Sequence, residues 1–241
     1  MTIQYVPLLQ VQREVYALPP GPERFQRYIE IVRDGGEPLS AMNPMGKAHC
    51  AALLDEYLAL DAEIIAERAI LEELPALADG SFPLKAGLVL VDDLKGGWAN
   101  RTACEYNRRV PEKVSADWLS VFLWTSEPTP SVESVESAVK TTLRRSAWLL
   151  RNGVPKTLGE VLAQERFTGS SHAPLTGDER EYVRDVLGPL LGTPASDMPT
   201  VVAALFGDEG AASLGYAPLG LKKDSGLRFA SSGFIQNSPV Q

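Results

Sequence analysis

The chain has few of the residues from which disulfide frameworks and metal sites are usually built. Its 241 residues include two cysteines, Cys50 and Cys104, and two histidines, His49 and His172. A small secreted protein held by disulfides needs more cysteines, and a thiolate zinc site usually needs closely spaced pairs of them. The sequence has no His-Glu-x-x-His pattern and no Cys/His cluster. It therefore predicts no conventional zinc site, while a metal held mainly by carboxylates stays open.

Long apolar runs and an excess of positive charge are also missing. No stretch approaches the roughly 20 apolar residues that span a bilayer, and the first twenty residues have neither a basic start nor a continuous apolar run. The formal net charge of −8 argues against general binding to nucleic acid or to a membrane surface, because both carry negative charge. Two isolated thiols suit a reducing compartment. We therefore expect a cytoplasmic protein.

Three segments have the pattern of β-strands. The run "AGLVLVDD" (86–93) is short and apolar, which is typical of a buried strand, and "DWLSVFLWTS" (117–126) is similar. Between them "RTACEYNRR" (101–109) alternates in polarity, as a half-exposed strand does. Lys95, Gly96 and Gly97 would turn the first strand back onto the second. These features predict a small, mainly antiparallel sheet over about 86–126.

Helices are expected on either side of this sheet in the sequence. Apolar residues at spacings of three and four, delimited by Asn43-Pro44 and Asp79-Gly80, predict one long helix over about 44–78. Further helices are expected over 22–34, 130–152 and 199–207, and two capping boxes each mark another helix start. These pair Thr157 with Glu160 and Thr176 with Glu179. The sequence thus predicts a predominantly helical α+β fold, with the sheet packed on the long helix.

The chain shows little sign of internal division. We expect one globular domain over 1–215, and the alternative is a division at the proline-rich break over 127–131. Residues 216–241 lack a helical or strand period and are rich in glycine and serine. We expect them to form an extended tail.

The densest group of chemically useful side chains lies between the first two predicted strands. Asp92 and Asp93 end a strand, where acids can hold a metal or act as a base. Trp98 offers a flat apolar wall, Asn100 can orient a ligand, and Arg101 can bind a phosphate or carboxylate through two hydrogen bonds. The same stretch also fits a hairpin with no function, and the turn pattern favours that interpretation.

Two further candidates lie at the start of the predicted long helix. Lys47 and His49 would add positive potential there, and His49 stands beside Cys50, with which it could form a thiolate pair. The surrounding "AMNPMGKAH" has the spacing of a phosphate-binding loop. However, Ala48 stands where that loop needs a hydroxyl group for Mg²⁺, and no buried strand precedes it.

The sequence leaves two hypotheses about function. The first is a protein that binds a small anionic ligand near the 92–101 turn, with hydrolysis or group transfer preferred over redox chemistry because no dinucleotide fingerprint is present. The second is a non-catalytic scaffold that binds a protein partner, or a second copy of itself, through the long helix or the tail. No cofactor is indicated under either hypothesis.

Overall fold

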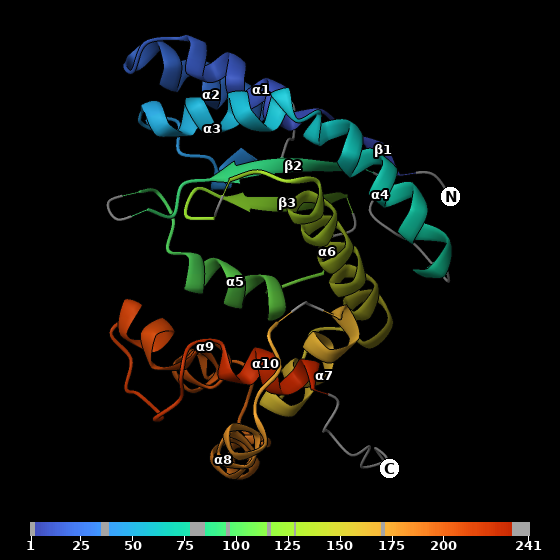
Figure 1. Cartoon of the computed structure of the whole chain (residues 1–241). Helices are drawn as coiled ribbons and strands as arrows, with labels where there is room; N and C mark the ends of the chain where they lie inside the picture. The colour runs from blue at the N-terminus through green and yellow to red at the C-terminus, as the bar shows by residue number, and fades with distance from the viewer. Residues whose placement is uncertain are drawn as a thin grey trace. The chain divides into compact units, whose positions relative to one another are not determined.

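The computed structural model describes most of the chain as two compact units (Figure 1). Unit 1 consists of Met1–Arg101 and Ser115–Ala147, and unit 2 of Thr102–Val114 and Trp148–Gln241. The boundaries lie near the start of α5 (Arg101–Arg109) and within α6 (Val132–Asn152), away from the 127–131 break that the sequence offers as an alternative division. The described residues are 3–34, 39–77, 85–94, 97–114, 117–127, 129–169 and 172–232.

Unit 1 is built around a three-stranded sheet. Its elements are β1 (Gln4–Tyr5), α1 (Leu8–Ala17), α2 (Pro22–Asp34), the 3₁₀ helix η1 (Leu39–Ala41), α3 (Ala48–Ala59), α4 (Ala62–Leu77), β2 (Lys85–Val91), β3 (Trp118–Trp124) and α6 (Val132–Asn152) as far as Ala147. Helices α1 and α4 pack on β2, and α3 packs on both of them, so that these three helices lie together on one side of the sheet (Figure 1).

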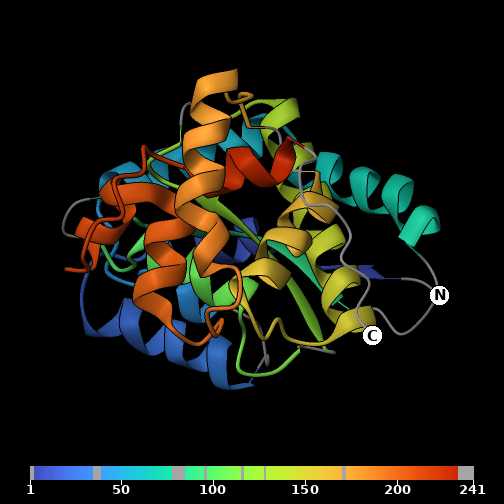
Figure 2. The ribbon, with the colours of Figure 1, turned by 90° about the horizontal axis from the view of Figure 1, so that it is seen from below.

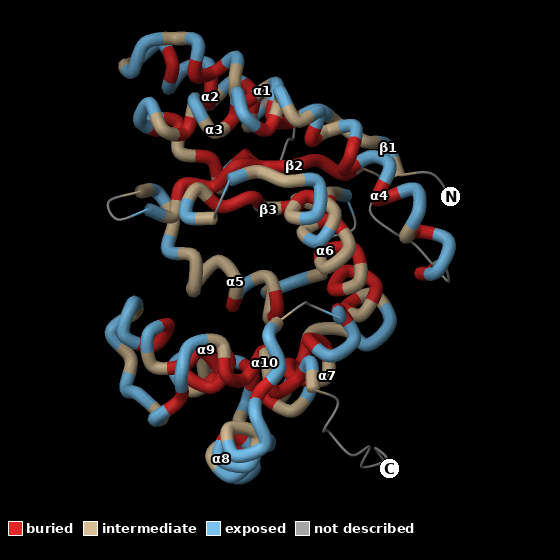
Figure 3. Tube along the Cα trace, viewed as in Figure 1, coloured by how far each residue is buried: buried red, intermediate tan, exposed pale blue. Residues whose placement is uncertain are grey.

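The sheet is parallel throughout, so the predicted antiparallel sheet is wrong. The strand order is β1-β2-β3, and β2 pairs with β3 in parallel from Lys85↔Trp118 to Val91↔Trp124. The two apolar strands themselves are confirmed within a few residues of their predicted bounds. Every residue of β2 from Ala86 to Val91 is buried, as Figure 3 shows along the strand. A continuous apolar run is typical of a parallel strand that is covered on both faces.

The predicted middle strand is the helix α5 (Arg101–Arg109). Arg109 Nη1 donates to the backbone oxygen of Glu105 at 2.8 Å, four residues earlier, which is a helical spacing. The polarity of these nine residues alternates, but as a helix they place Tyr106 and Arg109 on one buried face. The predicted hairpin is therefore wrong. Lys95 and Gly96, on which it depended, lie outside the described residues.

The predicted long helix over 44–78 is two helices, α3 and α4. Asp61 separates them with a φ of 58°, a left-handed conformation that a short polar side chain tolerates better than most. The backbone oxygen of Asp61 then accepts the Ile65 amide in the first turn of α4. Asn43 and Pro44 form a turn before α3 rather than a helix start. Asp79 and Gly80 lie outside the described residues.

Gln12 of α1 continues the hydrogen bonding of β2 where β1 ends. Because β1 has only two residues, the amides of β2 beyond Ala86 need other partners on that side. The buried Gln12 side chain accepts from the Leu90 amide at 2.8 Å and donates to the Leu90 oxygen at 2.9 Å. One side chain thus replaces a strand neighbour two residues before Asp92.

Unit 2 is helical in its described part. Besides residues 102–109 of α5 and the end of α6, it contains α7 (Leu158–Thr168), α8 (Gly177–Leu187), the 3₁₀ helix η2 (Gly188–Leu190), α9 (Met198–Ser213) and α10 (Ser225–Ser231). The capping box of Thr176 and Glu179 at α8 is confirmed. At α7, Thr157 accepts from the Glu160 amide, whereas the Glu160 carboxylate bonds the amide of Lys156. Helix α10, within the segment expected to be a tail, packs on α7, α8 and α9 (Figure 2).

Gly207 breaks α9 at a point where no other residue fits. Its φ is 74°, and a Cβ there would collide with the Lys222 backbone. We expect Gly207→Ala to destabilise unit 2 by about 1–3 kcal/mol, measured by denaturant unfolding. Gly188→Ala is the matched control, because Gly188 is helical and a Cβ there meets open space. Equal effects of the two substitutions would contradict this account.

None of the described helices is long and apolar enough to cross a membrane.

Candidate functional site

The candidate site of unit 1 lies at the edge of the sheet where the strands end. Asp92 directly follows β2, and Thr125 directly follows β3. Because the strands are parallel and in register from Lys85↔Trp118, their carboxyl ends reach the same edge. Ligands of open parallel sheets usually bind outside the carboxyl ends of the strands.

Asp92 is buried and held by hydrogen bonds to both carboxylate oxygens. Asn43 Nδ2 donates to Oδ2 at 3.0 Å, and Thr125 Oγ1 lies 3.2 Å from Oδ1. His49 Nε2 lies 3.1 Å from the same Oδ1. Burial raises the pKa of Asp92, but the hydrogen bonds from Asn43 and His49 outweigh it, so that the pKa lies below its usual range. The carboxyl group is therefore ionised at neutral pH.

The thiol of Cys50 also lies next to His49. The Nε2 atom of His49 lies 3.3 Å from Cys50 Sγ as well as 3.1 Å from Asp92 Oδ1. Potential ligand atoms of His49, Cys50 and Asp92 all lie within 4.8 Å of one another. His49 and Cys50 both belong to the first turn of α3, which begins at Ala48. A nitrogen, a sulfur and an oxygen thus converge on one small volume.

Cys50 forms the buried back of this cluster. It is 1% exposed, and burial with the neighbouring Asp92 charge raises the pKa of its thiol to about 12. Burial likewise raises the pKa of Tyr16, whose hydroxyl donates to the Asn43 oxygen at 2.6 Å. A Cβ on Gly46 would come within 3.0 Å of Cys50 Sγ and closer to Tyr16, so only glycine fits there. The thiol of Cys50 is therefore protonated at neutral pH, and it lies in a closely packed place.

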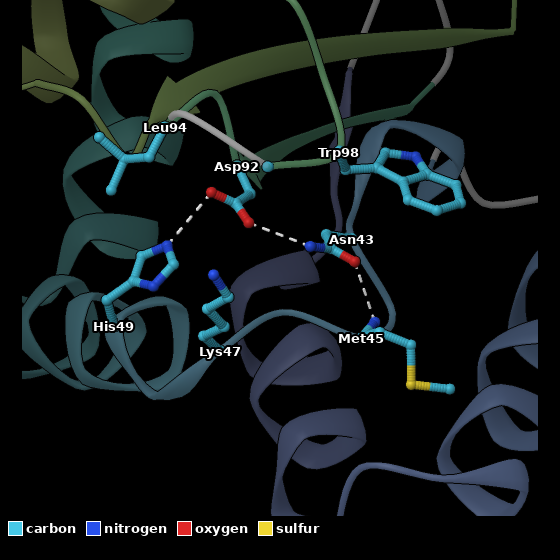
Figure 4. A pocket seen from close by; sticks show the side chains of 8 residues that line it. Asn43, Met45, Lys47, His49, Asp92, Leu94 and Trp98 are labelled. Carbon is cyan, nitrogen blue, oxygen red and sulfur yellow. Dashed lines mark hydrogen bonds and ion pairs between the residues drawn. The ribbon is translucent and has the colours of Figure 1, made fainter.

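A pocket of about 260 Å³ opens on the accessible side of Asp92 and His49. In Figure 4 the side chains of Lys47 and His49 point toward the Asp92 carboxylate. Trp98, which is 55% exposed, contributes an apolar wall. The lining residues are Asn43, Met45, Lys47, His49, Asp92, Leu94, Gly97 and Trp98. The structure therefore brings four of the residues singled out in the sequence, Lys47, His49, Asp92 and Trp98, to one pocket.

The other three sequence candidates lie elsewhere in unit 1. Asp93 turns to the segment after β3, where its carboxylate accepts the Ser126 amide at 2.9 Å. Arg101 forms an ion pair with Glu127 at 2.6 Å and lies over the Trp124 ring, 5.2 Å from its centroid. Asn100 is exposed and is not part of the pocket lining.

Sequence reasoning did not assign the residues that complete the site. The sequence pattern predicts only a helix start at Asn43, and it indicates no role for Thr125. A usable signal was present for Thr125, because it follows an apolar strand just as Asp92 does. For Cys50 the sequence indicates only that it could form a thiolate pair with His49, since its proximity to Asp92 depends on a contact 42 residues apart in sequence.

Comparison of the chain with protein-family models, curated proteins and solved structures finds no match to any of them.

Proposed function

We propose that unit 1 binds a small ligand with a phosphate or carboxylate group in the pocket at the sheet edge. The observation that carries the proposal is the lining itself, which combines a cationic side chain, an exposed indole and anchored polar groups. A small-molecule site is usually a largely apolar cleft with a few polar groups that point toward the ligand. The pocket also lies at the carboxyl ends of parallel strands.

Lys47 supplies the positive charge in this proposal. Its side chain is exposed, and within the described residues it has no ion-pair partner. It stands at the N-terminal end of α3, where the helix dipole adds to its charge. Arg101, in contrast, already faces Glu127 and Asp93. We therefore place the anionic group of the ligand at Lys47 and its apolar part against Trp98.

Asp92 and His49 define the reaction class that such a pocket would support. Asp92 fixes the imidazole of His49, and an oriented imidazole beside a ligand is a general base or acid. Hydrolysis or group transfer is thus our preferred chemistry. We also propose a cytoplasmic location, because neither Cys50 nor Cys104 forms a disulfide.

A thermal-shift screen tests the binding proposal. Wild-type protein and Lys47→Ala are compared against inorganic phosphate, sugar phosphates, nucleotides and small carboxylates. A ligand at 100 times its Kd stabilises by about 2.7 kcal/mol, which for a chain of this size is roughly 5–10 °C. We expect a shift of this size in the wild type and a loss of most of it in Lys47→Ala.

Two control variants test which positive side chain binds the anionic group of the ligand. Lys113→Ala removes an exposed lysine of unit 2 and should leave the shift unchanged. If Arg101→Ala abolishes the shift and Lys47→Ala does not, the anionic group lies at the 92–101 turn and our placement is wrong. The absence of any shift across the panel would contradict ligand binding.

The competing scaffold function rests on a separate observation. Ile64 and Leu71 of α4, seven residues apart, are 65% and 60% exposed. Most of the other apolar side chains of α4 are buried, among them Ile65, Ile70 and Leu74. The exposed pair is therefore narrow, and we prefer the pocket. Loss of a captured partner or of self-association in an Ile64→Ser, Leu71→Ser double variant would favour the scaffold.

A further inference from the structure

We infer that His49, Cys50 and Asp92 form a binding site for one zinc-type divalent metal ion. The inference goes beyond the proposed anionic ligand and does not depend on it, because the three side chains can bind a metal without that ligand. The set contains an imidazole, a thiol and a carboxylate, the three ligand types that zinc takes in proteins.

Two of the three distances between these atoms are close to those of tetrahedral coordination, and the third is no longer than 4.8 Å. Zinc–nitrogen and zinc–oxygen bonds of about 2.0–2.1 Å and a zinc–sulfur bond of about 2.3 Å place nitrogen and sulfur about 3.5 Å apart, and nitrogen and oxygen about 3.4 Å apart. The observed separations are 3.3 Å from His49 Nε2 to Cys50 Sγ and 3.1 Å from Nε2 to Asp92 Oδ1. Small outward movements of the side chains would admit the ion.

The geometry favours a metal over a nucleophilic triad. In a triad, one ring nitrogen of the histidine faces the nucleophile and the other faces the carboxylate. Here the same atom, His49 Nε2, faces both Cys50 and Asp92. Such convergence gives the thiol no separate base. A metal ion would displace the protons of Nε2 and of the thiol, and the three ligand atoms would then face a common centre.

Surrounding residues hold the ligands in place. Asn43 Nδ2 donates to Asp92 Oδ2, which leaves Oδ1 facing His49. Metal-binding carboxylates are commonly oriented by such outer hydrogen bonds. Cys50 is buried behind the site, whereas His49 and Asp92 also line the pocket. Three protein ligands on one side would leave the fourth position open to the pocket, which is the arrangement of catalytic rather than structural zinc sites.

Titration of the purified full chain with Co²⁺ tests the site directly, after metal has been removed with a chelator. We expect one Co²⁺ per chain, an intense visible spectrum typical of four-coordination, a thiolate-to-Co²⁺ charge-transfer band, and displacement of Co²⁺ by Zn²⁺. Cys50→Ser should abolish the charge-transfer band and lower the affinity by more than about 100-fold, because loss of a direct ligand exceeds the 10–100-fold cost of losing an outer partner. Asn43→Ala should retain the band and weaken binding by about 10–100-fold.

Cys104→Ser is the matched control, since it removes the other cysteine, which lies in unit 2. A band that persists in Cys50→Ser, or that Cys104→Ser removes, would overturn the assignment, as would the absence of saturable Co²⁺ binding in the wild type. Circular dichroism checks folding, and if Cys50→Ser does not fold, the half-exposed His49→Gln takes its place with the same expected loss of affinity.

Lys47→Ala separates this inference from the proposed ligand site. It should leave the Co²⁺ spectrum unchanged and should not lower the Co²⁺ affinity, because Lys47 is not a ligand and its charge repels a cation, while it should reduce anion binding. Metal binding without an anion effect would support the metal site and contradict the ligand proposal. A Lys47-dependent anion effect without metal binding would do the reverse.

Discussion

Glu165→Gln should destabilise unit 2 by about 3–5 kcal/mol, the usual effect of removing one partner from a buried ion pair. Arg109 is buried, and its guanidinium donates to Glu165 at 2.9 Å and to Glu105 at 2.5 Å. Burial alone would lower the pKa of Arg109, but the charges of Glu165 and Glu105 raise it above its ordinary value. The substitution keeps the shape of the side chain and removes one of the two negative charges that compensate the buried cation.

Denaturant unfolding measures the loss of stability in Glu165→Gln, and an exposed ion pair serves as the matched control. Glu209 lies 3.9 Å from Lys223, and both side chains are well exposed. Glu209→Gln should therefore change the stability by less than about 1 kcal/mol, as exposed ion pairs do. A double variant, Arg109→Met with Glu165→Gln, should lose less than the sum of the two single losses, because the two residues interact directly. Additive losses would show that the pair is not coupled.

The parallel order of the sheet could not be predicted because one short segment was assigned the wrong period. Both apolar strands were recognisable from their composition. Two strands joined by a short turn predict a hairpin, whereas two strands with a helix between them predict a parallel pair. The nine residues of α5 alternate in polarity, as a strand does, and also fit a helix that buries Tyr106 and Arg109. Assigning them to a strand therefore placed an antiparallel neighbour between β2 and β3, which in the structure pair directly with each other.

The candidate site was predictable only where it depended on local sequence. An acid after an apolar strand identified Asp92, and a charged helix start identified Lys47 and His49 even though the helix begins four residues later than expected. Arg101 also stood in a local pattern, but its ion pair with Glu127 depends on the end of β3 and cannot be derived from that pattern. The contacts of Asp92 with Asn43 and Thr125 join residues 49 and 33 positions apart. Only the folded chain shows them.

Gln12→Leu should destabilise unit 1 by about 2–6 kcal/mol. Leucine fills similar space but leaves the amide and the oxygen of Leu90 without their partner, and each buried unsatisfied group costs about 1–3 kcal/mol. Gln26→Leu is the matched control, because the Gln26 side chain is exposed and donates to the exposed side chain of Glu30, and its effect should stay within about 0.5 kcal/mol. Denaturant unfolding of both variants gives the comparison.

Gln12→Glu separates lost hydrogen bonds from lost packing. A buried glutamate is charged only at a cost, so its pKa in the folded protein rises above the value of about 4.3 in the unfolded chain. The protonated form restores both the donor and the acceptor for Leu90 and should therefore be fully stabilising below about pH 4. This stability is lost as the pH rises through the folded-state pKa, because the unfolded chain then releases its proton more readily. Relative to wild type, Gln12→Glu should thus become less stable with rising pH, while Gln12→Leu keeps a constant deficit. A deficit of Gln12→Glu that does not depend on pH would mean that packing, and not the bonds to Leu90, secures the strand that carries Asp92.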